Sequence, residues 1–191
     1  MTAVHHSRFV LGGARSGKSR FAVEQARQIG GSVAFLVTAR ALDGDMAARI
    51  ARHRAERPAG WTTLEEPYDV AASGRRAAAS HDLLVLDCVT VWVANLMERG
   101  DDDAAILAAA DDLAKLMRER LVSTILVSNE VGEGVHPPTE LGRRFRDLLG
   151  FVNQRLAAAA DHVTLLVAGI PMTVKDAPQP PARRDSTHEA P

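Results

Sequence analysis

The chain has 191 residues, and its 23 basic and 24 acidic side chains give a formal net charge of −1. This length predicts one domain, and a composition of 46% hydrophobic and 25% charged residues is typical of a globular protein rather than a disordered one. The near-neutral charge argues against nucleic-acid binding driven by counterion release, and the single cysteine, Cys88, excludes an intrachain disulfide. No apolar run reaches the ~18–20 residues that span a bilayer, and no secretory signal is present, so the sequence predicts a cytoplasmic protein.

Short apolar runs alternate along the chain with longer segments of helical spacing. This alternation predicts βαβ units that build a mostly parallel sheet flanked by helices. The expected strands are 9–11, 33–37, 83–86, 125–127 and 163–167, and the expected helices are 19–29, 43–56, 104–121 and the segment after Pro137-Pro138-Thr139. Residues 1–175 form the expected domain, whereas the proline-rich segment 176–191 has little to bury and is expected to be disordered.

The first expected strand leads into a phosphate-binding loop. Residues 12–19 read Gly-Gly-Ala-Arg-Ser-Gly-Lys-Ser, which matches the pattern glycine, four residues, glycine, lysine, serine between a strand and a helix. Glycines let main-chain N–H groups point at phosphate oxygens, Lys18 is expected to neutralise the β- and γ-phosphates, and the Ser19 hydroxyl is expected to bind Mg²⁺. The pattern therefore predicts nucleotide binding by Gly12, Gly13, Ala14, Arg15, Ser16, Gly17, Lys18 and Ser19.

Polar residues follow several of the other expected strands. Asp87 follows the buried strand 83–86, the position from which a carboxylate holds the metal opposite the loop serine; the alternative is a turn aspartate that caps the next segment. Cys88 beside it is interpreted as a small buried apolar residue without chemistry. Thr38 and Glu130 follow two further strands, and parallel open sheets bind ligands along this edge, so the pattern indicates one shared site.

A histidine lies among arginines in residues 49–57, which read Arg-Ile-Ala-Arg-His-Arg-Ala-Glu-Arg. On a helix, Arg49 and Arg57 share the face of His53, and these cations favour the neutral form of its imidazole. A neutral imidazole is a competent nucleophile toward phosphorus, and arginines can hold the phosphates of the group under attack. Taken alone, this stretch favours the alternative, a surface histidine on a solvated basic helix.

Taken together and in order, these motifs resemble one family, the bifunctional adenosylcobinamide kinase/adenosylcobinamide-phosphate guanylyltransferases of cobalamin biosynthesis. The resemblance covers residues 8–175 and rests on segments 12–19, 46–58, 87–96, 129–134 and 145–155, with Trp61, Thr63 and Glu65. With these motifs in place, the expected architecture is a single-domain P-loop (RecA-like) α/β fold with a mostly parallel central sheet flanked by helices.

The resemblance implies two successive reactions. ATP or GTP first phosphorylates the aminopropanol hydroxyl of adenosylcobinamide; GTP then gives GMP to that phosphate through a GMP–histidine intermediate, and pyrophosphate is released. The position that matches the histidine is His53, while Lys18, Ser19 and Asp87 would serve the nucleotide phosphates and Mg²⁺. The resemblance also implies a homotrimer, and it assigns the guanine nucleotide to Val37, Thr38, Ala39, Arg54, Ala55, Glu56, Arg57 and Glu65.

Two other functions fit parts of the pattern. One is a simple small-molecule kinase with the same loop and no covalent intermediate, which would not release pyrophosphate from GTP. The other is a nucleotide-dependent switch protein of RecA-like type, which would need a nucleic-acid or partner surface. The sequence shows no basic stripe with interleaved aromatic residues, and only eight aromatic residues are present, so nucleic acid is not an expected partner.

Overall fold

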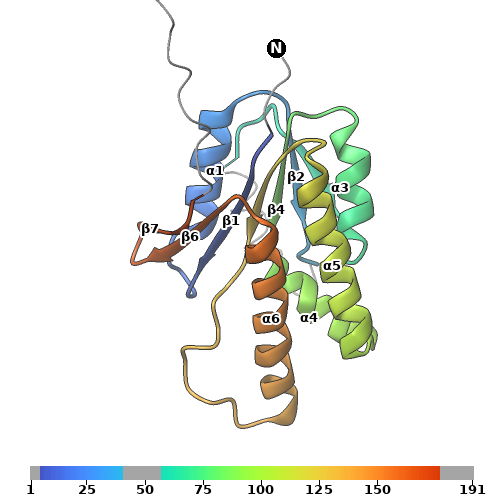
Figure 1. Cartoon of the computed structure of the whole chain (residues 1–191), viewed down its shortest axis with the longest axis vertical. Coiled ribbons are helices and arrows are strands. Elements are labelled where there is room, and N and C mark those ends of the chain that lie inside the picture. Colours follow the sequence, from blue (N-terminus) through green and yellow to red (C-terminus); the bar gives the residue numbers. More distant parts are fainter. Residues whose placement is uncertain (1–4, 41–56, 177–191) are drawn as a thin grey trace, which may run out of the picture.

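A seven-stranded sheet forms the centre of the molecule (Figure 1). The computed structural model describes residues 5–40 and 57–176; the helix expected over 43–56 and the tail 177–191 lie outside the described residues. The strand order is β3-β2-β4-β5-β1-β6-β7, with every pairing parallel except that of β6 with β7. The strands are β1 Ser7–Gly12, β2 Val33–Val37, β3 Thr62–Glu65, β4 Leu83–Asp87, β5 Ser123–Val127, β6 His162–Val167 and β7 Ile170–Lys175.

The predicted α/β fold with a mostly parallel sheet is confirmed. The five expected strands correspond to β1, β2, β4, β5 and β6, which occupy the middle of the sheet. Strands β2 and β5 are buried at every position, as expected for strands covered on both faces. The two edge strands, β3 and the antiparallel β7, were not predicted.

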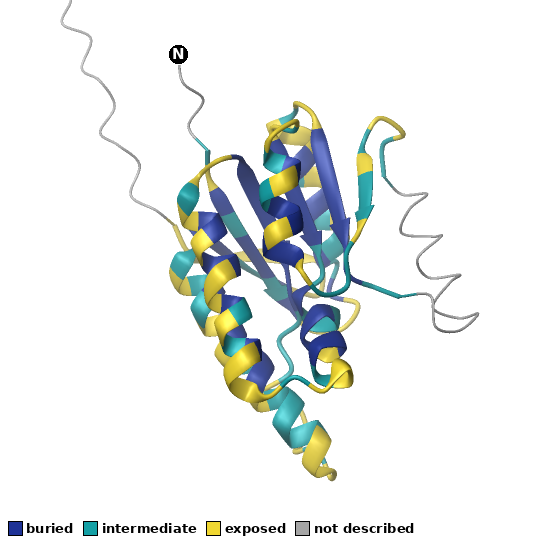
Figure 2. Cartoon of the chain, turned by 90° about the vertical axis from the view of Figure 1, so that its right-hand side faces the viewer, coloured by how far each residue is buried: buried dark blue, intermediate teal, exposed yellow. Residues whose placement is uncertain are grey.

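Helices cover both faces of the sheet (Figures 1 and 2). Helix α1 packs on one face, and α3, α4, α5 and α6 pack on the other. No helix within the described ranges is both long enough and apolar enough to cross a membrane. The helices are α1 Lys18–Ile29, α3 Val70–Ala78, α4 Val89–Arg99, α5 Asp103–Glu119 and α6 Glu140–Ala159.

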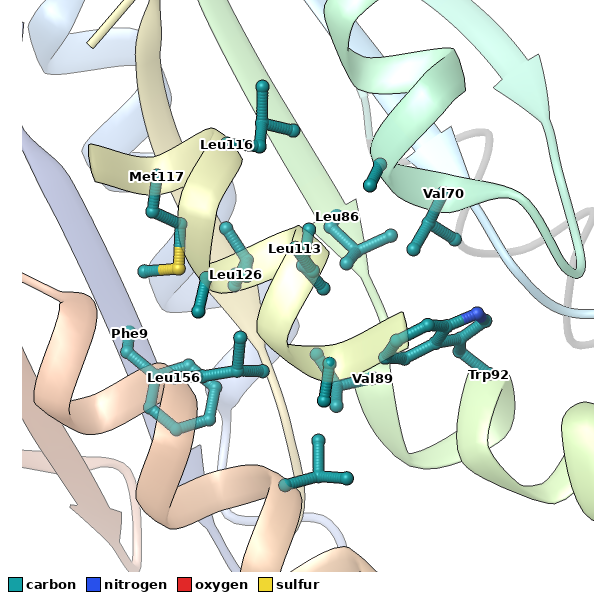
Figure 3. Close-up of a cluster of buried hydrophobic side chains, with 14 of the residues drawn as sticks. Phe9, Val70, Leu86, Val89, Trp92, Leu113, Leu116, Met117, Leu126 and Leu156 are labelled. Atoms are coloured by element: carbon teal, nitrogen blue, oxygen red, sulfur yellow. The ribbon is translucent and has the colours of Figure 1, made fainter. Parts of the chain in front are cut away.

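The larger of the two cores lies between the sheet and the four helices α3 to α6. Full burial of one large apolar side chain contributes about 1.5–3 kcal/mol, so this cluster is the main source of stability. Figure 3 labels Phe9, Leu86 and Leu126 from the strands, and Val70, Val89, Trp92, Leu113, Leu116, Met117 and Leu156 from the helices. Gly74 lets α3 approach closely, because a Cβ atom there would lie 2.6 Å from Leu116 Cδ2 and 2.9 Å from Leu84 Cδ2.

Helix α6 begins beyond the sheet. The loop that follows β5 runs past the carboxyl ends of the strands and returns as α6 (Figure 1). The helix starts after Thr139, whose Oγ1 accepts a hydrogen bond from the Gly142 N–H at 3.1 Å. This arrangement agrees with the predicted start after Pro137-Pro138-Thr139 and leaves the first turns of α6 near the carboxyl edge of the sheet.

Asp161 joins the start of β1 to the turn between α6 and β6. Its Oδ2 accepts hydrogen bonds from the Ser7 N–H at 2.9 Å and the Ser7 hydroxyl at 3.0 Å, and its Oδ1 accepts one from Arg120 at 2.6 Å. Burial raises the pKa of the Asp161 carboxyl, but the hydrogen bonds from Ser7 and the charge of Arg120 together outweigh it, so the pKa lies below its usual value.

The Asp161→Asn substitution is expected to lower the free energy of unfolding by about 1–3 kcal/mol, because hydrogen bonds to the charged carboxylate are lost. Because the pKa of Asp161 is lower in the folded state, this carboxylate contributes its full share to the free energy of unfolding above its unfolded-state pKa of ~4. The contribution is lost as the pH falls through the folded-state pKa. Urea unfolding at neutral pH and in acid measures both effects. The exposed Asp111, which pairs with Arg155, supplies the control Asp111→Asn, expected to cost under ~1 kcal/mol. A difference between wild type and Asp161→Asn that is the same at all pH values would contradict the prediction.

Candidate active site

The loop between β1 and α1 has a backbone that only its glycines permit. Gly12 has a φ of 152°, and a Cβ atom there would lie 2.5 Å from the Leu166 carbonyl oxygen. Gly17, at the amino end of α1, has a φ of 95° in the left-handed region. The Ser16 N–H donates to the Gly13 carbonyl at 3.3 Å, and the Gly169 N–H donates to the Ser16 carbonyl at 3.0 Å. The loop and the amino end of α1 thus lie at the carboxyl edge of the sheet, where main-chain N–H groups and the helix dipole favour an anion.

Lys18 places its ammonium group over this loop. Its Nζ donates to the Gly13 carbonyl at 2.5 Å and to Ser16 Oγ at 3.5 Å, and the residue is only 7% exposed. Ser19 follows in the first turn of α1. The Lys18 ammonium group and the Ser19 hydroxyl, which the motif predicts to serve the phosphates and Mg²⁺, therefore both lie in the first turn of α1.

Asp87 is the last residue of β4. It pairs in register with Val37 of β2 and with Val127 of β5, and β5 in turn pairs with β1. One strand therefore separates the carboxylate from the strand that carries the loop, a lateral distance of about 10 Å between strand axes. The amino-cap position of α4 is the next residue, Cys88, whose side chain makes no capping hydrogen bond.

Thr38 fixes the turn that follows Asp87. It is fully buried, and its Oγ1 donates to the Cys88 carbonyl at 2.8 Å and accepts from the Cys88 N–H at 3.0 Å. Burial, together with the neighbouring Asp87 charge, raises the pKa of the Cys88 thiol to about 11, which keeps it neutral at physiological pH. Cys88 therefore behaves as the unreactive residue that the sequence predicts, and the hydroxyl of Thr38 serves the main chain of the neighbouring strand.

The Thr38→Val substitution is expected to lower the activity of the site about ten- to a hundredfold, since a small displacement of Asp87 is costly for the chemistry. It also leaves the Cys88 N–H and carbonyl without the hydroxyl, at a cost of about 1–3 kcal/mol in unfolding free energy. Steady-state kinetics and urea unfolding measure the two effects. Thr38→Ser keeps the hydroxyl and is the matched control; equal loss of activity in both variants would contradict the positioning role.

Of the other predicted residues in the described part, Glu65 lies at the carboxyl edge of the sheet, whereas Arg57 lies on one of its faces. Glu65 ends β3 in register with Val37, and its side chain is exposed. Arg40 pairs with Glu98 of α4 at 2.9 Å. The Arg57 guanidinium lies 3.8 Å from the centroid of the Phe35 ring, on the face of the sheet that α1 covers. The predicted residues His53, Arg54, Ala55 and Glu56 lie outside the described residues.

Two buried residues of α4 hold the chain beside β2, and sequence reasoning gave them no role. Asn95 Nδ2 donates to the Thr38 carbonyl at 2.8 Å and to the Pro67 carbonyl at 3.2 Å. Trp92 Nε1 donates to the Tyr68 carbonyl at 2.7 Å. The sequence signal for these contacts is a side-chain amide, Asn95, three residues after Trp92 on the apolar face of a helix, because a buried amide needs hydrogen-bond partners.

A second buried network ties β5 and α6 to the start of α4. Ser128 Oγ donates to Asn153 Oδ1 at 2.7 Å, and Asn153 Nδ2 donates to the Asn129 carbonyl at 3.0 Å. The Asn129 N–H donates to Thr90 Oγ1 at 2.7 Å. The next residue, Glu130, donates its N–H to the Gly12 carbonyl at 3.1 Å, so this network also fixes one side of the phosphate loop.

The sequence profile of the family described as "Cobinamide kinase / cobinamide phosphate guanyltransferase" matches residues 8–174. The chain is 46% identical to the bifunctional adenosylcobalamin biosynthesis protein CobP of Pseudomonas aeruginosa, over 88% of this chain and 97% of that protein. It is 41% identical to CobU of Salmonella typhimurium, over 87% of this chain and 98% of that protein. CobU of Escherichia coli is 39% identical over the same shares.

Among solved structures, the chain is similar to an ATPase from a bacterial type III secretion system. The TM-score is 0.54 at 14% identity, and the similarity covers 85% of this chain and 51% of the ATPase. At this identity the similarity shows the fold alone, an α/β fold built on a mostly parallel sheet.

Proposed function

This chain belongs to the cobinamide kinase / cobinamide phosphate guanyltransferase family, and from that membership we propose how its site carries out the two activities of the family. The protein is a bifunctional enzyme of cobalamin biosynthesis that phosphorylates cobinamide and transfers a guanylyl group to cobinamide phosphate. The observation that carries the proposal is the phosphate loop at residues 12–19, which lies at the same sheet edge as Asp87.

In the kinase step, the aminopropanol hydroxyl oxygen of adenosylcobinamide attacks the γ-phosphorus of ATP or GTP. A P–O bond to the substrate forms, the bond to the β-phosphate oxygen breaks, and the nucleoside diphosphate leaves while the hydroxyl proton is released. Loop N–H groups and the Lys18 ammonium offset the charge on the β- and γ-phosphates. The buried position of Lys18 supports this role, because a charge of low solvent exposure acts more strongly on a bound phosphate.

In the guanylyl step, a ring nitrogen of His53 attacks the α-phosphorus of GTP. A P–N bond forms, the bond to the β-phosphate oxygen breaks, and pyrophosphate leaves. An oxygen of cobinamide phosphate then attacks the same phosphorus; the new P–O bond gives adenosylcobinamide-GDP, and the P–N bond breaks to restore His53. A covalent intermediate divides one displacement into two, each with a good leaving group. The position of His53 in the matched range supports the assignment, as do the arginines around it.

The donor set at the edge of the sheet fits Mg²⁺. The Ser19 hydroxyl and the Asp87 carboxylate are hard oxygen ligands, and Mg²⁺ in nucleotide sites takes one or two carboxylates plus substrate phosphates rather than a cage of protein ligands. Within residues 5–40 and 57–176 no cluster of three or more histidine, cysteine or acidic side chains could hold a metal alone, which agrees with a nucleotide-dependent site. Bound there, the ion would neutralise phosphate charge.

The remaining nucleotide contacts are proposed for the residues at the exits of β2 and β3. Val37, Thr38 and Ala39 end one strand, Glu65 ends its neighbour, and Val37 and Glu65 pair in register. Arg54, Ala55, Glu56 and Arg57 would complete the guanine-nucleotide site. This assignment is supported by the shared edge and by the family resemblance of the motifs.

We further propose a cytoplasmic homotrimer. A cytoplasmic location is supported by the single cysteine and by the biosynthetic role of the relatives. Assembly is supported by four apolar side chains at the edge of the sheet, which are 49–65% exposed: Val167, Ile170, Met172 and Val174. Sedimentation equilibrium of the full chain tests the assembly; a monomeric mass would contradict it.

The two activities are tested with separate substrates. Adenosylcobinamide is expected to be phosphorylated by ATP or GTP, and its phosphate is expected to release pyrophosphate from GTP in equal amount to the adenosylcobinamide-GDP formed. Phosphorylation without pyrophosphate release would favour the alternative of a simple kinase. GTP or ATP hydrolysis that single-stranded DNA stimulates and cobinamide does not would favour the switch-protein alternative.

A further inference from the structure

A polar cavity lies at the end of the sheet opposite to the phosphate loop. Its volume is about 300 Å³, and it is lined by Arg8, His162, Thr164, Thr173, Lys175 and Asp176. Arg8 pairs with His162 at the starts of β1 and β6, and Thr164 pairs with Thr173 of the edge strand. Arg8 precedes Gly12 by four strand residues, about 13 Å along β1, so the cavity is separate from the nucleotide site.

The guanidinium group of Arg8 has no partner within the described part of the chain. Its Nε is buried and makes no hydrogen bond to the described residues. An arginine side chain remains charged and carries five N–H donors in a rigid fork. Buried donors in folded proteins are almost always satisfied, so the buried Nε without a hydrogen bond, on an arginine that lines a cavity, points to a ligand for this guanidinium.

The other lining residues add donors from different directions. Lys175 Nζ donates to the carbonyls of Ala157 and Ala158 at 3.1 and 3.0 Å. An ammonium group has three N–H donors, so one of them remains for a ligand. His162 Nδ1 contacts Asp176 Oδ1 at 2.5 Å, so the second ring nitrogen of His162, Nε2, remains for a ligand. The hydroxyls of Thr164 and Thr173 complete the lining. Among the described residues that line the cavity, Asp176 alone carries a carboxylate, and its Oδ1 already contacts His162 Nδ1.

We propose that this cavity binds an oxyanion of the phosphate class. The planar fork of Arg8 matches two phosphate oxygens, while the ammonium and the two hydroxyls can reach the others. Two fixed cations, Arg8 and Lys175, face one carboxylate, so the lining favours a negatively charged ligand. The cavity has room for more than one tetrahedral group, and inorganic phosphate and diphosphate share the chemistry that it recognises.

The test separates this cavity from the phosphate loop. The full-length Lys18→Ala variant is titrated calorimetrically with inorganic phosphate and, separately, with diphosphate, each without nucleotide. Adding Arg8→Gln is expected to weaken the affinity about ten- to a hundredfold, the usual effect of losing a charge-assisted hydrogen bond. The matched control, Arg118→Gln, removes an exposed arginine of α5 and should leave the affinity unchanged. The anion that binds more tightly, phosphate or diphosphate, is then the better ligand of this cavity.

Three results would overturn the proposal. These are equal affinity with and without Arg8→Gln, no detectable binding of either anion at millimolar concentration, and a change of oligomeric mass in Arg8→Gln, which would assign the guanidinium to a second copy of the chain. Folding is checked by urea unfolding without added anion. Arg8→Gln should then unfold at the same or a higher urea concentration than its parent, because the lost group has no partner in the described part of the fold.

Discussion

His53→Ala is expected to abolish guanylyl transfer and to leave most of the cobinamide kinase activity. Removal of a covalent nucleophile lowers a rate on the order of a thousandfold or more, because the remaining groups bind the substrate but cannot form the intermediate. The kinase step uses the loop and the substrate hydroxyl, so it does not need the imidazole. GTP labelled at the α-phosphate should leave acid-labile label on the wild-type protein and none on His53→Ala.

His81→Ala supplies the matched control. His81 lies after α3, where its Nδ1 is 3.0 Å from the Ala77 carbonyl, and it precedes β4 at the opposite edge of the sheet from Asp87. This variant should be labelled like the wild type. Full labelling of His53→Ala would remove the assignment of His53, while loss of both activities in it would show that the segment serves the nucleotide generally rather than as the nucleophile.

Lys18→Ala is expected to lower kcat/KM of both reactions by about a hundred- to a thousandfold. Its ammonium would offset the charge on the γ-phosphate in one reaction and on the leaving pyrophosphate in the other. Parallel assays with adenosylcobinamide and with its phosphate measure the two losses. The control Lys115→Ala changes an exposed lysine of α5 and should leave both rates unchanged. A loss confined to the kinase would show that the two reactions use separate triphosphate sites.

The central part of the fold could be predicted from the sequence because its signals are local. Strands that are buried on both faces read as continuous apolar runs, as in Val33–Val37 of β2. The phosphate loop carries its own conformational requirement, since the left-handed backbone at Gly17 needs glycine. The sequence singles out Asp87 as a candidate because a carboxylate ends an otherwise apolar strand.

The edges of the sheet could not be predicted in this way. Strand β3 has only four residues and no buried position, and β7 is exposed throughout and contains Pro171, which argues against a strand. Both strands depend on pairing with a neighbour already in place. Hydrogen bonds to β2 and to β6 therefore stabilise β3 and β7 as strands, and no residue pattern within either segment predicts them.

Two helices were missed because tertiary packing overrides their local preferences. Helix α4 begins with Val89, Thr90 and Val91, β-branched residues that favour strands. Helix α3 contains Gly74, which lowers helix propensity but is needed for the close approach to Leu116. The roles of Asn95 and Asn153 depend on partners more than twenty residues away, which a single sequence does not identify.

The strand between β1 and β4 has a further consequence for the enzyme. Because β5 separates the loop from Asp87, the width of this one strand sets the distance across the proposed site for Mg²⁺ and triphosphate. Ile125 and Val127 of β5 pack in the core on the face that α1 covers, so replacement of either by a smaller residue would leave a cavity and loosen the packing of β5 before it unfolds the domain. The earliest symptom of such damage should be a raised magnesium requirement at moderate temperature, visible as a shifted metal titration while the far-UV circular dichroism spectrum is still native.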